Sequence, residues 1–204
     1  FTYNFGTITK ASGIPRVPFL EASKAMARGQ GFAGEGDTLT ASLMYALLGI
    51  YPDTTFAEMF CPGWSDETVF LSHMGEYNLR ISAHRPVVRK KAYSFSDSGD
   101  MAVAYGTFRA GKAVYVNLTP TGGGRYRLIL SPIEMLEPDS PEMKCSLEGY
   151  FHPCLPLTRF LKEFSLAGGT HHGAIVYGGD LDVLSAFGEM SGFEVKLING
   201  GGKE

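Results

Sequence analysis

The runs Met101-Ala-Val-Ala-Tyr-Gly-Thr-Phe108, Lys112-Ala-Val-Tyr-Val-Asn-Leu118 and Arg125-Tyr-Arg-Leu-Ile-Leu130 decide the fold class of this chain. They are short and rich in Val, Ile, Tyr and Phe, and turn residues separate them at 110–111 and 121–124. Short strands at such spacing predict an antiparallel sheet or a small barrel. The three glycines at 122–124 predict a hairpin loop, because a phosphate-binding loop normally leads into a helix and here a strand follows.

Outward from these runs, the pattern predicts further strands and several helices. A segment at 55–59 is ambiguous, the acidic segment 134–142 is expected to be a surface connection, and the glycine-rich tail from 200 is expected to be disordered. The remaining expected strands are 1–5, 68–73, 79–81, 86–94, 174–177 and 193–198, and the expected helices are 19–27, 38–48, 157–164 and 181–190.

Composition narrows the class of protein. The chain has 204 residues, 44% of them hydrophobic, which is enough for one full core. A net charge of -3 without a basic run argues against a nucleic-acid surface. No apolar stretch approaches the roughly 20 residues of a membrane span. Three cysteines without metal-type spacing favour free thiols and a reducing, cytoplasmic compartment, although a single disulfide is also compatible with them.

A glycine-rich segment, Gly31-Phe-Ala-Gly-Glu-Gly-Asp37-Thr38, presents one carboxylate at the start of a helix. Glycines allow tight turns and close approach of another group. Asp37 or Thr38 suits the helix N-cap. Taken alone, the segment is most simply a turn with a solvated Glu35.

Histidines supply the other candidate chemistry. His73 ends an expected strand, and His171 and His172 lie in a glycine-rich loop between a helix and a strand. Together with Glu35 they have the composition of a mixed nitrogen and oxygen site for a divalent cation such as Mn²⁺, Mg²⁺, Co²⁺ or Zn²⁺. Their separations form no local motif, however, and from physics alone a histidine pair in a loop is more often a surface or capping feature.

Simpler interpretations apply to the neighbouring polar residues. His84 and His152 are expected to be surface or structural, and Asp37 to be a helix cap rather than a ligand. Glu76 either orients His73 from behind or faces solvent. Both alternatives stay open at this point.

The order of the motifs resembles that of one known family, the C-terminal part of L-arabinose isomerase in the L-fucose/L-arabinose isomerase superfamily. The resemblance covers nearly the whole chain, including Phe1-Thr-Tyr-Asn-Phe5 and Phe56-Ala-Glu-Met59. The ordered segments are Gly31-Phe-Ala-Gly-Glu-Gly-Asp37, Leu71-Ser-His-Met-Gly-Glu76, Arg125-Tyr-Arg-Leu128 and Leu166-Ala-Gly-Gly-Thr-His-His172. The most specific motifs among them are Phe-Ala-Gly-Glu-Gly-Asp at 32–37 and Ala-Gly-Gly-Thr-His-His at 167–172.

The resemblance implies an α+β fold. Residues 1–30 would be the end of a truncated middle α/β domain, and residues 31–204 an antiparallel β-barrel-like C-terminal isomerase domain with flanking helices. It implies a homo-oligomer whose active site also draws on regions outside this chain. This piece alone is therefore expected to be inactive.

The resemblance also implies the chemistry. In that family a Mn²⁺-type ion is held by two glutamates and two histidines, and a proton moves between C1 and C2 of an open-chain sugar through an ene-diol. Carried over by motif, Glu35, His73 and His172 are metal ligands, Glu35 is also the acid/base residue, and His171 faces the substrate.

One position departs from the family pattern. The first metal-binding glutamate of the family follows the Phe-Thr-x-x-Phe segment, and here that position is Gly6. Glu21 is the nearest downstream carboxylate, but it lies in an expected helix. Gly6 favours the alternative hypothesis of a diverged relative that binds sugar or metal without turnover. A third possibility is another metal-dependent reaction on a polyol or a sugar acid, with a carboxylate supplied from elsewhere.

Overall fold

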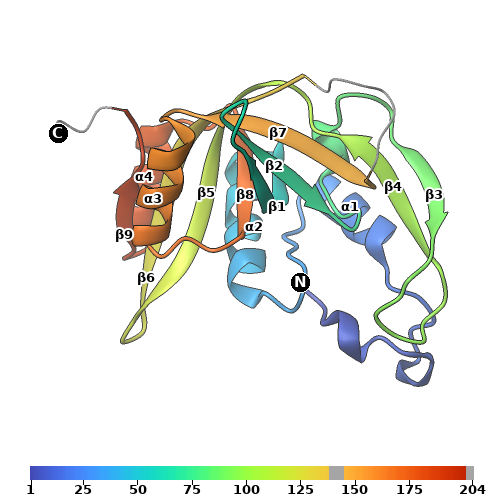
Figure 1. Cartoon of the computed structure of the whole chain (residues 1–204). Coiled ribbons are helices and arrows are strands. Elements are labelled where there is room, and N and C mark those ends of the chain that lie inside the picture. The colour runs from blue at the N-terminus through green and yellow to red at the C-terminus, as the bar shows by residue number, and fades with distance from the viewer. Residues whose placement is uncertain (138–144, 201–204) are drawn as a thin grey trace.

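The computed structural model describes residues 1–137 and 145–200 of the chain (Figure 1). Its α-helices are α1 (Phe19–Ala27), α2 (Thr38–Ile50), α3 (Leu157–Leu166) and α4 (Leu181–Met190). Its strands are β1 (Thr54–Gly63), β2 (Thr68–His73), β3 (Val87–Lys91), β4 (Met101–Thr107), β5 (Gly111–Gly122), β6 (Arg125–Met135), β7 (Leu147–Pro153), β8 (His172–Tyr177) and β9 (Glu194–Leu197). The predicted α+β class is confirmed.

The strands form one mixed sheet in the order β3-β4-β7-β2-β1-β8-β5-β6-β9. β6 also pairs with β7, so β7, β2, β1, β8, β5 and β6 make a closed ring. Most neighbours are antiparallel, as predicted, but β4–β7 and β6–β9 are parallel. The β5–β6 hairpin turns at 122–124, where all three glycines have positive φ, so the hairpin interpretation of that segment is confirmed.

Side-chain alternation along the ring strands separates two cores. Tyr115 on β5 and Ile175 on β8 belong to a cluster that takes side chains from all six ring strands, which places it inside the ring. Their neighbours Val116 and Val176 belong to a second cluster, shared with α2 and α4. Successive side chains of a strand point to opposite faces of the sheet, so neighbouring residues contribute to different cores and the sheet is buried on both faces.

Helices cover the ring on different sides. α3 buries Leu157, Phe160 and Phe164, at helical spacing, in the cluster inside the ring. In Figure 1, α3 and α4 stand beside β6 and β9 at the C-terminal end of the sheet, and β3 and β4 lie at the opposite end. α1 packs near β4, where Phe19 and Val103 share a third cluster.

The predicted strand at residues 1–5 is wrong. Within the described chain this segment pairs with no strand, and Phe5–Thr7 form a short 3-10 helix. Its alternating rings are used differently: Tyr3 contacts Phe5, Phe19 and Phe32 in an aromatic cluster. The N-terminal ammonium donates a hydrogen bond to the carbonyl of Gly31 at 2.7 Å. Residues 1–30 are therefore in contact with the rest, and the domain boundary at residue 30 stays a prediction.

Other elements also differ from expectation. Leu79–Ile81 form a 3-10 helix instead of a strand, the ambiguous segment 55–59 belongs to β1, and β7 was not predicted. β6 runs into the expected surface connection at 134–142, whose last part, from 138, lies outside the described residues, as do residues 201–204 of the expected disordered tail.

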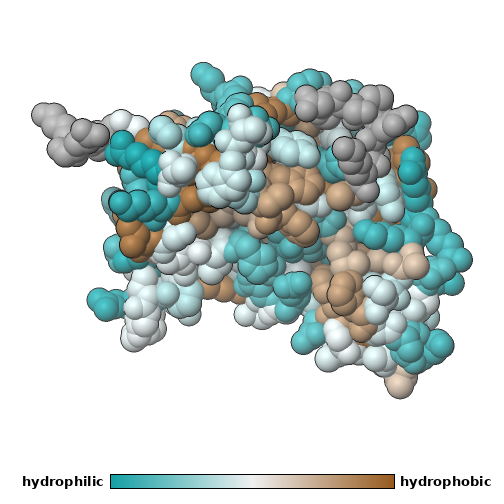
Figure 2. Space-filling model, viewed as in Figure 1, coloured by the Kyte–Doolittle hydropathy of each residue, from teal (hydrophilic) through white to brown (hydrophobic). Residues whose placement is uncertain are grey.

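Among the described helices, none combines the length and the apolar character needed to cross a membrane. One face of the molecule carries an apolar area over the strands at its centre, between hydrophilic areas (Figure 2). Aromatic contacts join the exposed sides of β1, β2 and β7: Phe60 lies 6.2 Å from Phe70, and Phe70 lies 4.9 Å from Tyr150, between ring centroids.

Candidate metal centre

The glycine-rich loop has its conformation because two of its glycines leave no room for a side chain. A Cβ on Gly31 would lie 2.4 Å from the backbone nitrogen of Tyr45 on α2, so the loop contacts the helix directly. A Cβ on Gly34 would lie 3.1 Å from Nε2 of His73. The loop therefore runs between α2 and His73, and it carries Glu35 to the same place.

Glu35 itself has a strained backbone. Its φ is 59°, in the left-handed region that L-residues other than glycine rarely adopt. Its side chain is about half exposed, and its Oε2 lies 3.7 Å from Nε2 of His172. Strain of this kind persists only where the surrounding structure enforces it, and it concentrates at functional sites.

Asp37 makes the helix-cap contact that the sequence predicted and a contact with His172 that it did not predict. Its carboxylate accepts the backbone N–H of Thr40 at 2.8 Å, so it is the N-cap of α2, as predicted. Its Oδ2 also lies 2.8 Å from Nδ1 of His172. Asp37 thus fixes the start of the helix and one imidazole together.

Sheet register brings a third carboxylate between the two predicted histidine ligands. β1 lies between β2 and β8, and Glu58 on β1 is opposite His172 on β8. Oε1 of Glu58 lies 2.7 Å from Nε2 of His73, which ends β2, and 3.4 Å from Nε2 of His172. The Nε2 atoms of both imidazoles therefore meet one buried carboxylate oxygen.

Glu76 contacts His73 on the side of the imidazole that faces away from Glu58. Its Oε2 lies 2.6 Å from Nδ1 of His73, and Tyr3 donates a hydrogen bond to its Oε1 at 3.4 Å. Glu76 is fully buried. Of the two alternatives for Glu76, orientation of His73 is therefore confirmed and exposure to solvent is wrong.

The ring of Phe56 completes the packing. Its centroid lies 5.2 Å from that of His73 and 5.2 Å from that of His172, edge-on to both. With an apolar ring against both imidazoles and a carboxylate on each Nδ1, the two histidines have little freedom to rotate.

Burial and neighbouring charges shift the titration of these groups. Burial acts to raise the pKa of Glu58, but its contacts with His172 and His73 lower that pKa to about 2. Burial acts to lower the pKa values of the histidines, but the carboxylates around them raise the pKa of His73 to about 10 and of His172 to about 9. Without a cation, the surplus of carboxylates thus favours protonated imidazoles.

The donor set fits a divalent cation. Oε1 of Glu58 and Nε2 of His172 are buried and, among the described residues, make no hydrogen bond of normal geometry despite their short separation. Histidines that bind a metal through Nε2 usually have Nδ1 held by a carboxylate or a carbonyl, as both do here. Imidazole nitrogens with carboxylate oxygens suit cations of the Mn²⁺ and Zn²⁺ type.

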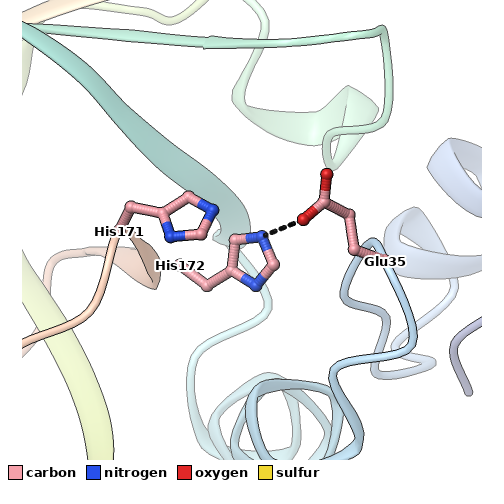
Figure 3. A group of neighbouring side chains, drawn as sticks. All are labelled: Glu35, His171 and His172. Atoms are coloured by element: carbon pink, nitrogen blue, oxygen red, sulfur yellow. Dashed lines mark ion pairs between the residues drawn. The ribbon is translucent and has the colours of Figure 1, made fainter.

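The residues expected from the sequence are brought together to different degrees (Figure 3). One ligand atom each of Glu35, His171 and His172 lies within 4.8 Å of the others. In Figure 3 the carboxylate of Glu35 points toward His172, and the two imidazoles lie side by side, with centroids 4.2 Å apart. His171 is exposed and His172 buried. His73 is not in that group and joins it through Glu58.

Glu58 is the residue that sequence reasoning missed. It belongs to the segment 55–59, whose ambiguous pattern did not show which residues would be buried. The available signal was a charged residue inside an apolar run, because a carboxylate is rarely buried without a partner.

The remaining candidates lie outside this centre. Glu21 is exposed on α1 and pairs with Lys24 at 2.7 Å. His84 is exposed, and Nδ1 of His152 lies 3.2 Å from the carbonyl oxygen of Glu67. The expectation that both histidines are surface or structural residues agrees with these positions.

Comparison with known proteins adds a family relation. Residues 53–194 match the family model of the L-arabinose isomerase C-terminal domain. The chain is 32% identical over 201 residues to L-arabinose isomerase 1 of Bacillus licheniformis, an alignment that covers 95% of this chain and 40% of that protein. It is 32% identical over 208 residues to L-arabinose isomerase of Geobacillus thermodenitrificans, covering 98% of this chain and 41% of that protein. The enzyme of Erwinia tasmaniensis is 29% identical over 207 residues, with 98% and 40% covered. The chain thus spans about two fifths of the length of these relatives.

Proposed function

This chain belongs to the L-arabinose isomerase C-terminal domain family, and from that premise we propose that it carries the metal centre of a sugar isomerase. The reaction is the interconversion of an aldose and a ketose, with L-arabinose as the first candidate because the relatives are named for it. The barrel-like family fold and the homo-oligomer remain expectations from the resemblance, and the cytoplasmic location remains an expectation from the cysteines. The three cysteines are free, which agrees with a reducing compartment.

One observation supports the metal centre most strongly: two buried imidazoles point Nε2 at one carboxylate oxygen while separate carboxylates occupy Nδ1 of each. We propose Glu35, His73 and His172 as residues that hold a divalent cation, with Mn²⁺ as the expected ion. When bound, such a cation acts as a Lewis acid that polarises the sugar carbonyl.

The exposed side chains of this centre have separate proposed roles in proton transfer and in substrate contact. Glu35 is the exposed carboxylate of the centre, and its strained loop holds it where a substrate can reach it. We assign it the proton transfer between C1 and C2, which a carboxylate can perform as general base and then general acid. His171 is exposed beside His172 and is placed to contact a sugar hydroxyl.

The test is an isomerase assay of the full-length protein that carries this chain, with Mn²⁺ and a panel of pentoses and hexoses. We expect ketose formation that Glu35→Gln and His172→Ala abolish. Exposed Glu21→Gln is the matched control, since it removes a carboxylate outside the centre and should leave the rate unchanged. No turnover of any sugar by the wild-type protein would contradict the proposal.

Gly6 favours a second candidate function, a relative that binds metal or sugar without turnover. The position at which the family has its first metal-binding glutamate is Gly6 here. Glu35 is therefore the only one of the two family glutamates that this chain retains at its expected position. Metal binding measured by calorimetry, together with no activity in the same assay, would support this function over the first.

A further inference from the structure

We propose that Glu58 is the second carboxylate ligand of this metal centre and takes over the role for which position 6 has no side chain. The inference rests on the proposed metal centre, and it identifies a ligand that the sequence resemblance did not assign. Position 6 and Glu58 are far apart in the chain, so the structure alone connects them.

Position 6 follows a residue that packs near the centre, but it lacks a donor. Gly6 is in the 3-10 helix Phe5–Thr7, and the ring of Phe5 lies 6.5 Å from that of His73. A Cβ at Gly6 would meet only Oδ1 of Asn4, at an ordinary contact distance of 3.4 Å. A side chain would therefore fit at position 6, and none is present.

Glu58 reaches both histidines from β1. It is 6% exposed on a strand that is paired on both sides, so its backbone is fixed by β2 and β8. Its Oε1 is the only atom for which short contacts to Nε2 of both His73 and His172 are found among the described residues. A cation held by both imidazoles through Nε2 would have this carboxylate within reach.

A purely structural ion pair explains this arrangement less well. Each imidazole already has a carboxylate on Nδ1, Glu76 for His73 and Asp37 for His172. With Glu35 at 3.7 Å from Nε2 of His172, Glu58 brings the carboxylates around the two imidazoles to four. Oε1 of Glu58 is close to both imidazoles, but it and Nε2 of His172 lack a hydrogen bond of normal geometry, as do Nδ1 of His73 and Oε2 of Glu76. Buried polar atoms with poorly aligned partners are costly unless another partner satisfies them. A divalent cation supplies that partner.

Calorimetric titration of the metal-free full-length protein with Mn²⁺ tests the inference without any activity readout. We expect Glu58→Gln to weaken Mn²⁺ binding by about 100-fold or more, since loss of even the outer partners of metal ligands reduces affinity about 10- to 100-fold. Circular dichroism in chelator checks folding. The matched control is Glu194→Gln on β9, which removes a carboxylate paired with Arg127 and should bind Mn²⁺ like the wild type.

Two further variants separate a ligand from a structural partner. Glu58→Asp keeps the charge but shortens the reach, and we expect at least about tenfold weaker binding from a folded protein. In Glu58→Gln, adding Gly6→Glu should restore binding, because it returns a carboxylate to the centre without repairing the contacts of β1. If Gly6→Glu does not restore binding, Glu58 acts only by positioning the histidines and the inference is wrong.

The outcomes also separate this inference from the proposed function. Wild-type affinity in both Glu58 variants, with binding lost in Glu35→Gln and His172→Ala, overturns the role of Glu58 and leaves the metal centre standing. No Mn²⁺ binding by the wild-type protein overturns the metal centre, and the inference with it.

Discussion

Replacing Glu35 by glycine should make the protein more stable and the site less functional. At φ 59° an L-residue carries a cost of about 1–2 kcal/mol relative to glycine in the same conformation. Glycine also raises the conformational entropy of the unfolded chain, which lowers the free energy of unfolding by about 0.5–1 kcal/mol and offsets part of the stabilisation. The net expectation is that Glu35→Gly raises the free energy of unfolding by about 0.5–1 kcal/mol.

The assay is urea unfolding of the metal-free protein, compared with Glu35→Gln. Glutamine keeps the strained backbone and removes the charge, so the comparison subtracts any contribution from the ion pair between half-exposed Glu35 and buried His172, whose nearest atoms are 3.7 Å apart. We expect Gln to stay within about 0.5 kcal/mol of wild type while both variants lose Mn²⁺ affinity and turnover. A Glu35→Gly protein no more stable than Glu35→Gln would refute the assignment of backbone strain to this site.

Three further outcomes follow from the contacts. Gly31→Ala should destabilise the protein by about 1–3 kcal/mol in urea unfolding, because its Cβ would meet the backbone of Tyr45 and cannot be accommodated by a rotamer change. Asp37→Ser should keep the α2 cap, yet weaken Mn²⁺ binding by about 10- to 100-fold because Nδ1 of His172 loses its carboxylate; equal affinity would count against the centre. Asp53 pairs with two arginines, and although burial opposes it, these contacts lower its pKa. Its contribution is therefore present above the ordinary aspartate pKa and lost as the pH falls below it, so wild type and Asp53→Asn should differ in unfolding midpoint at pH 7 and converge in acid.

The sequence predicted the elements whose signals are local. α1 and α4 have the expected bounds, because each has a clean apolar period and a clear end. β7 was missed because Gly149 and Pro153 weaken its strand pattern. Gly149 is nevertheless required there, since a Cβ would lie 2.0 Å from the ring of Phe108, a contact that arises only in the folded sheet.

The site was predictable in parts for the same reason. The cap at Asp37 is a local feature and was predicted. Glu58 becomes a site residue only because β1 lies between β2 and β8, and residue spacing carries no information about that pairing. The strand expected at 1–5 was wrong for a different reason. The segment does alternate, but Tyr3 packs against aromatic rings, and among the described residues the segment has no partner strand.

The position of β8 has a consequence for synthesis of the protein. This strand comes from the last fifth of the chain, yet it lies in the sheet between β1 and β5, which are made much earlier. Until residue 177 has left the ribosome, β1 and β5 each have an unpaired edge that can associate with other chains. The nascent chain should therefore depend on chaperones until that moment. Arrival of β8 also delivers His172, so sheet closure and assembly of the candidate metal centre are one event.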